Sequence, residues 1–192
     1  MSDPKDDSYK SLFQAGAKLV KGRVNLDGHE LPRPGFFERR RLVKALRFFE
    51  RAAEVEPPYG AASLFAAKIE DRLGHSQENL RWLRKAQVVA PDNVIVSLEL
   101  GGALSKLGLQ VEAVSILSAA AQLNPTDARV HSNLGVALLL SGATEASIAT
   151  FKQLVALEPD LKKNAGLLNL AIEVLAGRKP RPMTEADIAR SI

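Results

Sequence analysis

Prolines and glycines recur along this chain at one fixed interval. The prolines are Pro57, Pro91, Pro125 and Pro159, and the glycines are Gly74, Gly108 and Gly142, each lying midway between two successive prolines. A period of roughly 20 to 50 residues is the sequence signature of a fold built from stacked copies of one small unit. This interval therefore constrains the fold more than any other feature of the sequence.

Each period contains two segments with helical spacing of apolar residues. One lies between a proline and the next glycine, and the other lies between that glycine and the next proline. Glycine permits the backbone conformation that ends a helix, whereas proline cannot continue one. Asn93, Asp127 and Asp160 follow the prolines and can cap the next helix. Each period therefore predicts a helix, a turn and a second helix.

Small and large residues occupy matching positions in successive periods. Gly101 and Gly135 share a position in the first helix, and Leu117 and Phe151 share one in the second. A glycine lets two helices approach closely, and a bulky residue fills the space beside it. The pattern predicts that each glycine marks the crossing point of a helical hairpin.

This pattern resembles the tetratricopeptide repeat, a 34-residue motif of two helices. The resemblance covers three contiguous periods over residues 60–159 and extends less fully over 37–57 and 161–177. Departures include His131 at the motif's tryptophan position and Glu70 at an aromatic one. The resemblance implies an all-α fold: a right-handed superhelical solenoid of helical hairpins, closed by a C-terminal capping helix at Lys162–Leu175.

The repeat register divides the chain into three segments. Residues 1–59 form a degenerate first repeat with a helix at 9–20, an inserted loop at about 23–36 and a basic helix at 37–55. Placing Gly16 at the crossing position leaves more residues before the second helix than the repeat period allows, which is why a loop is expected. Residues 60–177 hold three full repeats and the capping helix. Residues 178–192 form a basic tail in which Thr184 caps a short helix.

Composition excludes several classes of protein. Hydrophobic residues make up 46% of the chain and charged residues 25%, as in globular proteins. With no cysteine there is no disulfide framework or thiolate metal site, and the cytoplasm is the expected compartment. The amino-terminal sequence lacks the pattern of an export signal, and we expect no membrane span. The net charge of +4 is weak evidence for nucleic-acid binding.

We expect no enzymatic activity, no metal and no cofactor. His29, His75 and His131 lie far apart in the register and lack the spacing of metal ligands, so we assign them structural roles. The motifs of serine nucleophiles and of phosphate-binding loops are absent from the sequence.

The resemblance places function in a concave groove lined by the first helix of each repeat. The family's groove positions map onto Leu64, Lys68, Asp71, Ile95, Leu98, Ser105, Arg129, Ser132, Val136, Leu139 and Leu170, with Gly102 and Gly166 between them. This surface is apolar with a few basic points and lacks the paired Lys and Asn of the family's carboxylate clamp. It suits an apolar or amphipathic segment of a protein partner, which the chain would bind as a scaffold, adaptor or chaperone. A second reading is that the chain's own tail or a second copy covers these residues.

A basic stripe offers an alternative function. Arg40, Lys44, Arg47 and Arg51 lie at spacings of four, three and four on the predicted helix. The stripe is either a solvated face or a site for an acidic protein, nucleic acid or an anionic surface. We see no interleaved exposed aromatic residues of the kind that bind RNA bases.

Overall fold

The computed structural model describes residues 8–24, 31–55 and 60–192, and the regular structure within them is entirely helical. The all-α prediction is confirmed. The chain divides into two compact units, residues 1–96 and 97–192, each of which is described by itself. This division falls in the first turn of one helix, whereas the segments drawn from the sequence follow the repeat register.

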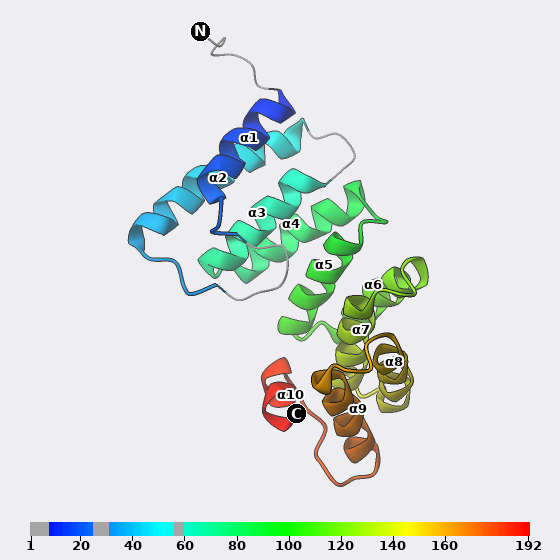
Figure 1. Cartoon of the computed structure of the whole chain (residues 1–192). Coiled ribbons are helices and arrows are strands. Elements are labelled where there is room, and N and C mark those ends of the chain that lie inside the picture. The colour runs from blue at the N-terminus through cyan, green and yellow to red at the C-terminus, as the bar shows by residue number, and fades with distance from the viewer. Residues whose placement is uncertain (1–7, 25–30, 56–59) are drawn as a thin grey trace. The chain divides into compact units, whose positions relative to one another are not determined.

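Helical hairpins make up both units (Figure 1). The first unit contains α1 (Tyr9–Val20), α2 (Phe36–Glu54), α3 (Ala61–Leu73) and α4 (Ser76–Val89). The second contains most of α5 (Val94–Lys106), then α6 (Gln110–Leu123), α7 (Ala128–Ser141), α8 (Thr144–Leu157), α9 (Lys162–Leu175) and α10 (Glu185–Ser191). The helix expected at 9–20 coincides with α1, and the capping helix expected at Lys162–Leu175 coincides with α9. Pro57, His29 and residues 25–30 of the expected loop lie outside the described residues.

The periodic glycines lie in the turns within the hairpins. Gly74, Gly108 and Gly142 have φ angles of 84°, 76° and 91°. This left-handed conformation strains any residue with a Cβ atom, which explains why glycine recurs at this position. The prediction of a glycine turn between the two helices of each period is confirmed.

The second set of glycines lies at the helix crossings. A Cβ atom added to Gly135 would lie 2.4 Å from a ring carbon of Phe151, and one added to Gly101 would lie 2.6 Å from Leu117. Gly16 meets the ring of Phe49 at 2.9 Å in the same way. Gly16 and Phe49 are about twice as far apart in the sequence as the other two pairs, so the extra residues lie within the first hairpin. These contacts confirm the predicted register of the crossings.

A buried hydrogen bond accompanies the crossing in each unit. In the second unit the Ser147 hydroxyl donates to the Gly135 carbonyl at 2.9 Å. In the first unit the Asn79 amide donates to the Ala67 carbonyl at 2.9 Å. Ser147 lies two periods after Asn79, and Gly135 lies two periods after Ala67, so the same interaction recurs. It fixes the second helix to the backbone of the first where the helices are closest.

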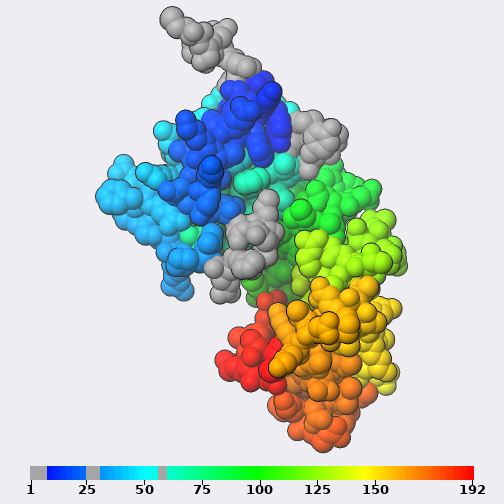
Figure 2. Space-filling view, viewed as in Figure 1, coloured from blue at the N-terminus to red at the C-terminus, as the bar shows by residue number. Residues whose placement is uncertain are grey.

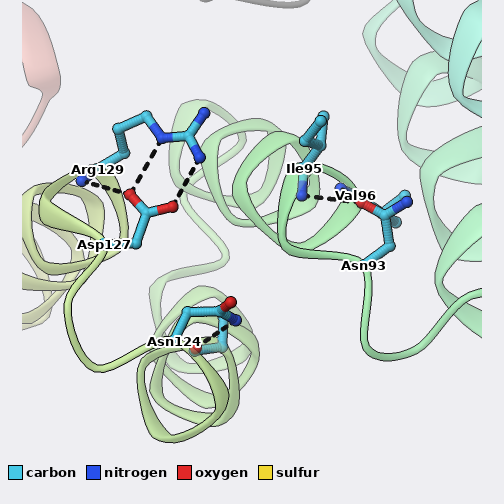
Figure 3. Close-up of polar contacts among 7 residues, drawn as sticks. Asn93, Ile95, Val96, Asn124, Asp127 and Arg129 are labelled. Atoms are coloured by element: carbon cyan, nitrogen blue, oxygen red, sulfur yellow. Dashed lines mark hydrogen bonds and ion pairs between the residues drawn. The ribbon is translucent and has the colours of Figure 1, made fainter.

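Four of the described helices begin at side-chain caps. At the start of α1 the Ser8 hydroxyl accepts a hydrogen bond from the Ser11 amide at 3.4 Å, and Figure 3 shows the caps of α5 and α7. The Asn93 side chain accepts hydrogen bonds from the amides of Ile95 at 3.0 Å and Val96 at 3.3 Å. Asp127 accepts from the Arg129 amide at 3.0 Å and also pairs with the Arg129 guanidinium at 2.6 Å. Thr184 and Asp187 form a capping box at the start of α10. The prediction for Asp160 is wrong: α9 begins one residue later than it requires, and Leu161 takes the N-cap position without a side-chain bond.

Removing the Asp127 cap should destabilise the second unit. We expect Asp127→Ala to lower the free energy of unfolding by about 1 kcal/mol, and Asp127→Asn by less because an amide oxygen can still cap. The hydrogen bond from Arg129 lowers the pKa of Asp127 from its ordinary value of 3.8. The carboxylate's contribution is therefore present above about pH 4 and is lost as the pH falls through the folded-state pKa. Urea titrations at pH 7 and pH 3 should show the difference between wild type and Asp127→Ala shrinking at the lower pH. A constant difference would contradict this assignment.

Arg72 of α3 holds the described ends of the inserted loop. Its guanidinium donates to the carbonyl oxygens of Arg23 and Leu31, each at 3.2 Å, and of Pro32 at 2.5 Å. It also pairs with Glu38 near the start of α2 at 2.9 Å. One partly buried side chain therefore ties both ends of the loop to α3, and the sequence offered no signal for this contact.

Candidate partner-binding surfaces

The predicted groove residues of the first unit differ in exposure. On α3, Leu64 is buried, Lys68 is half-buried and Asp71 is exposed. Ile95, in the first turn of α5, is half-buried. Leu64 is therefore a core residue, and the expectation that it lines an open surface is corrected. The apolar part of this face that remains accessible is Ile95.

An open apolar strip lies on α5 in the second unit. Leu98 is half-buried, and a Cβ atom added at Gly102 would have no neighbour within 4 Å, so there is free space beside it. Ser105 is buried instead, and its carbonyl accepts a hydrogen bond from the Gln110 side chain at 3.1 Å. This hydrogen bond links the carboxyl-terminal end of α5 to the start of α6. Because Ser105 is buried, the expectation that it lines the groove is corrected.

The face of α7 and α9 is covered. Arg129 is exposed and Ser132 is half-buried, but Leu139 and Leu170 are fully or almost fully buried. They belong to one apolar cluster with Ile188 of α10, and Val136 packs against this cluster. The expectation that Leu139 and Leu170 line an open groove is corrected. The physical reason is that the carboxyl-terminal helix contributes its own isoleucine to the cluster.

Several contacts hold α10 on this face. The terminal Ile192 lies beside Gly166 of α9, where an added Cβ atom would lie 3.3 Å from the Ile192 Cβ. The Arg181 guanidinium donates to the Leu140 carbonyl at 2.5 Å, and the Lys179 ammonium donates to the Ser191 carbonyl at 3.1 Å. Figure 2 shows the carboxyl-terminal residues, in red, lying against the surface of α9, in orange. The short helix expected at Thr184 is therefore docked.

The basic stripe on α2 is exposed along its whole length. Arg40, Lys44, Arg47 and Arg51 all have exposed side chains. The charge of Arg47 acts on Glu50, whose pKa is nevertheless raised, first by burial and then by the nearby Glu70 carboxylate. The stripe therefore presents four exposed basic side chains on one face of α2.

Two exposed aromatic residues begin the same helix. Phe36 is 69% exposed and Phe37 is 79% exposed, and the Arg40 guanidinium lies 5.8 Å from the centre of the Phe36 ring. The sequence predicts no exposed aromatic residues interleaved with the stripe, and these two residues precede the stripe instead. Their position in the sequence could have indicated their exposure. Both precede Leu42, the first buried residue of α2, so neither falls on a core position.

The described histidines have structural partners. His131 Nε2 donates to the Pro125 carbonyl at 2.8 Å, and His75 contacts the buried Glu70 carboxylate at 2.7 Å. His29 lies outside the described residues. Within the described ranges, no group of three His, Cys, Asp or Glu side chains is placed to hold a metal ion. Nor is any helix there both long and apolar enough to cross a membrane.

This chain is similar to known proteins in sequence and in fold. Protein FlbA of Caulobacter vibrioides is 28% identical over 122 residues, which cover 64% of this chain and 20% of that protein. The solved structure of YrrB, described as a TPR protein with an unusual peptide-binding site, superposes with a TM-score of 0.71 at 16% identity, covering 92% of this chain and 82% of that one. MamA from Desulfovibrio magneticus RS-1, residues 41 to the end, superposes with a TM-score of 0.72 at 18% identity, covering 98% and 93%.

A family model locates the repeat within this chain. Residues 111–170 match the model described as tetratricopeptide repeat. This range includes Gly135 and Phe151, whose contact the repeat pattern predicts. Because the family match and the contact at the helix crossing fall on the same residues, we conclude that residues 111–170 are tetratricopeptide repeat.

Proposed function

We propose that this chain binds an apolar or amphipathic segment of a partner protein on the concave side of its first helices, acting without catalysis as a scaffold, adaptor or chaperone. Tetratricopeptide solenoids are protein-interaction scaffolds that use this surface. The observation that carries the proposal is the strip on α5, where the half-buried Leu98 adjoins free space at Gly102. An apolar side chain of a partner can be desolvated there without displacing any residue of α5.

YrrB supports the choice of ligand. That protein shares the fold and is described as having a peptide-binding site. In the second unit the proposed groove residues are Leu98 of α5 and Ser132 and the partly buried Val136 of α7, with Arg129 as a polar point. In the first unit they are Ile95, with Lys68 and Asp71 as polar points. A short peptide segment with apolar side chains and a few charges fits this composition.

Gly102→Glu is the sharpest test of this surface. Because an added Cβ atom meets nothing at this position and glutamate favours helix, the fold should be retained. The carboxylate should oppose desolvation of an apolar partner and weaken binding at least about tenfold. The measurement is co-precipitation of native partners identified by mass spectrometry, with circular dichroism to check folding.

The matched control is Ala119→Glu, which introduces the same charge at an exposed position on α6. It should leave partner recovery unchanged. Equal recovery with wild type, Gly102→Glu and Ala119→Glu would contradict the proposed groove.

The second candidate function is binding of an anionic surface by the start of α2. The observation that favours it is the exposed pair Phe36 and Phe37 beside Arg40 and Lys44, because apolar and basic side chains together suit a charged interface. Reversing Arg40, Lys44 and Arg47 to glutamate in the same co-precipitation separates the two candidates. If recovery fails with the reversed stripe and falls steeply with salt, while Gly102→Glu retains its partners, the second candidate replaces the first.

A further inference from the structure

We propose that α10 is an internal ligand of the α7–α9 face, and that it is displaced by a partner helix carrying branched aliphatic residues four positions apart. The part concerning the partner rests on the proposed function. The part concerning α10 stands on the contacts of this chain alone.

The position of Ile188 shows what the face accepts. This side chain is 4% exposed and joins Leu139 of α7 and Leu167 and Leu170 of α9 in one cluster. Ile192, four residues later, lies beside Gly166, the one residue of α9 without a side chain. Residues four apart share one side of a helix, so both isoleucines point to the same face. The face therefore has a deep site for one aliphatic side chain and a shallower site for a second.

The rest of α10 is attached weakly. Ala186, Ala189 and Arg190 are exposed, and apart from Pro182 so are all the residues from 176 to 185. The bond from Lys179 to the Ser191 carbonyl is exposed to solvent, whereas the bond from Arg181 to the Leu140 carbonyl is partly buried. Besides the isoleucines, the interactions that oppose release include the burial of Pro182 and the bonds of Arg181 and Lys179.

The geometry of the connection allows α10 to leave. Residues 176–184 join it to α9 and span about 30 Å when fully extended. A helix of 7 residues is too short to be stable by itself in water, so α10 is helical because its capping box and its docked isoleucines support it. Once released, this segment should lose its helix, which makes docking and folding of α10 a single step.

The same features define the competing partner. It should present two branched aliphatic residues in an i, i+4 pair on an otherwise polar helix, because Ile188 is buried in the face and Ile192, which is 47% exposed, contacts its edge beside Gly166. The partner must outcompete a covalently attached copy, so only a segment that binds more tightly or at a high local concentration displaces it.

A peptide of residues 178–192 tests the internal ligand directly. Its binding, followed by fluorescence anisotropy, is compared for the full chain, for a chain ending at Gly177 and for the full-length variant Ile188→Glu. Without an internal competitor, the shortened chain and Ile188→Glu should bind the peptide at least about tenfold more tightly than the full chain. A peptide carrying Ile188→Glu should bind none of them.

Ala189→Glu provides the matched control, because this neighbouring side chain is exposed on the same helix. It should behave as the unaltered chain does. The proposal is overturned if the wild-type peptide binds the full chain as tightly as the shortened one, or binds neither.

Hydrogen exchange of the unaltered chain gives a readout that does not depend on whether a variant folds. An excess of the 178–192 peptide should speed exchange of the chain's own amides at 188–192 and leave those of α8 unchanged. Unchanged protection of α10 at saturating peptide would overturn the proposal. Neither assay uses the native partner, so loss of partner binding in Gly102→Glu and failure of α10 displacement remain separate results.

Discussion

Replacing Gly135 with leucine should lower the free energy of unfolding by about 3 kcal/mol, at the upper end of the usual cost of overpacking. A Cβ atom at this position would lie 2.4 Å from a ring carbon of Phe151, and Phe151 is fully buried, so its ring has no free space into which to move. The added atoms must push α7 and α8 apart. The loss should appear as a fall of about 6 to 12 °C in the midpoint of thermal unfolding, measured by circular dichroism.

Two adjacent glycines on α5 test whether overpacking at the helix crossing causes this loss of stability. Gly101→Ala places a Cβ atom 2.6 Å from the buried Leu117, whereas Gly102→Ala places one in open space. The first should destabilise, and the second should stabilise by about 0.5 to 1 kcal/mol because alanine favours helix over glycine. If both substitutions shift the midpoint in the same direction, helix propensity and not packing at the crossing governs these positions.

The sequence predicted these helix crossings because the same pair of residue types recurs in successive repeats. Gly101 and Gly135 share one position, and the residues that contact them, Leu117 and Phe151, share another. A contact that recurs at a fixed interval can be recognised without knowing the fold. The same logic located Gly16 against Phe49, even though the inserted loop separates the two in the sequence.

Contacts that do not recur from repeat to repeat could not be predicted from the sequence. Arg72 bonds to loop carbonyls about 40 residues away in sequence, and backbone acceptors carry no signature in the side-chain pattern. The docking of α10 depends chiefly on one isoleucine in a helix of 7 residues, which is too short for apolar periodicity to define a face. For that reason the sequence placed Leu139 and Leu170 on first-helix positions and offered coverage by the chain's own tail only as a second reading, which the structure bears out for these two residues.

The same limit affected the expected consequences of shortening the chain. The repeat pattern alone predicts that removal of residues 183–192 has little effect, and that removal of the capping helix exposes a core. In the structure Ile188 is part of the core cluster, so the tail contributes to the apolar packing that α9 provides. The cap of this repeat array consists of α9 together with α10.

The largest loss of stability among polar substitutions is expected at Leu167 of α9. Leu167→Asp should lower the free energy of unfolding by about 4 kcal/mol or more, because it removes a buried side chain and places a carboxylate among apolar groups. Leu167 is 1% exposed and shares its cluster with Phe151 and Leu154 of α8. An array whose last apolar face is uncovered exposes these residues to water. Urea titration should show the loss, accompanied by aggregation of the variant at high concentration.

Ile172→Asp is the matched control on the same helix. Because Ile172 is 38% exposed, the carboxylate of the introduced aspartate can remain hydrated. It should cost less than about 1 kcal/mol. The pH dependence then identifies the mechanism. Burial raises the folded-state pKa of an introduced aspartate above its unfolded value, so the charge penalty is present at neutral pH and is relieved as the pH falls. The deficit of Leu167→Asp relative to wild type should therefore be smaller at pH 4 than at pH 7, while that of Ile172→Asp stays constant. If the two variants are equally stable at pH 7, α9 does not cover the core of this unit.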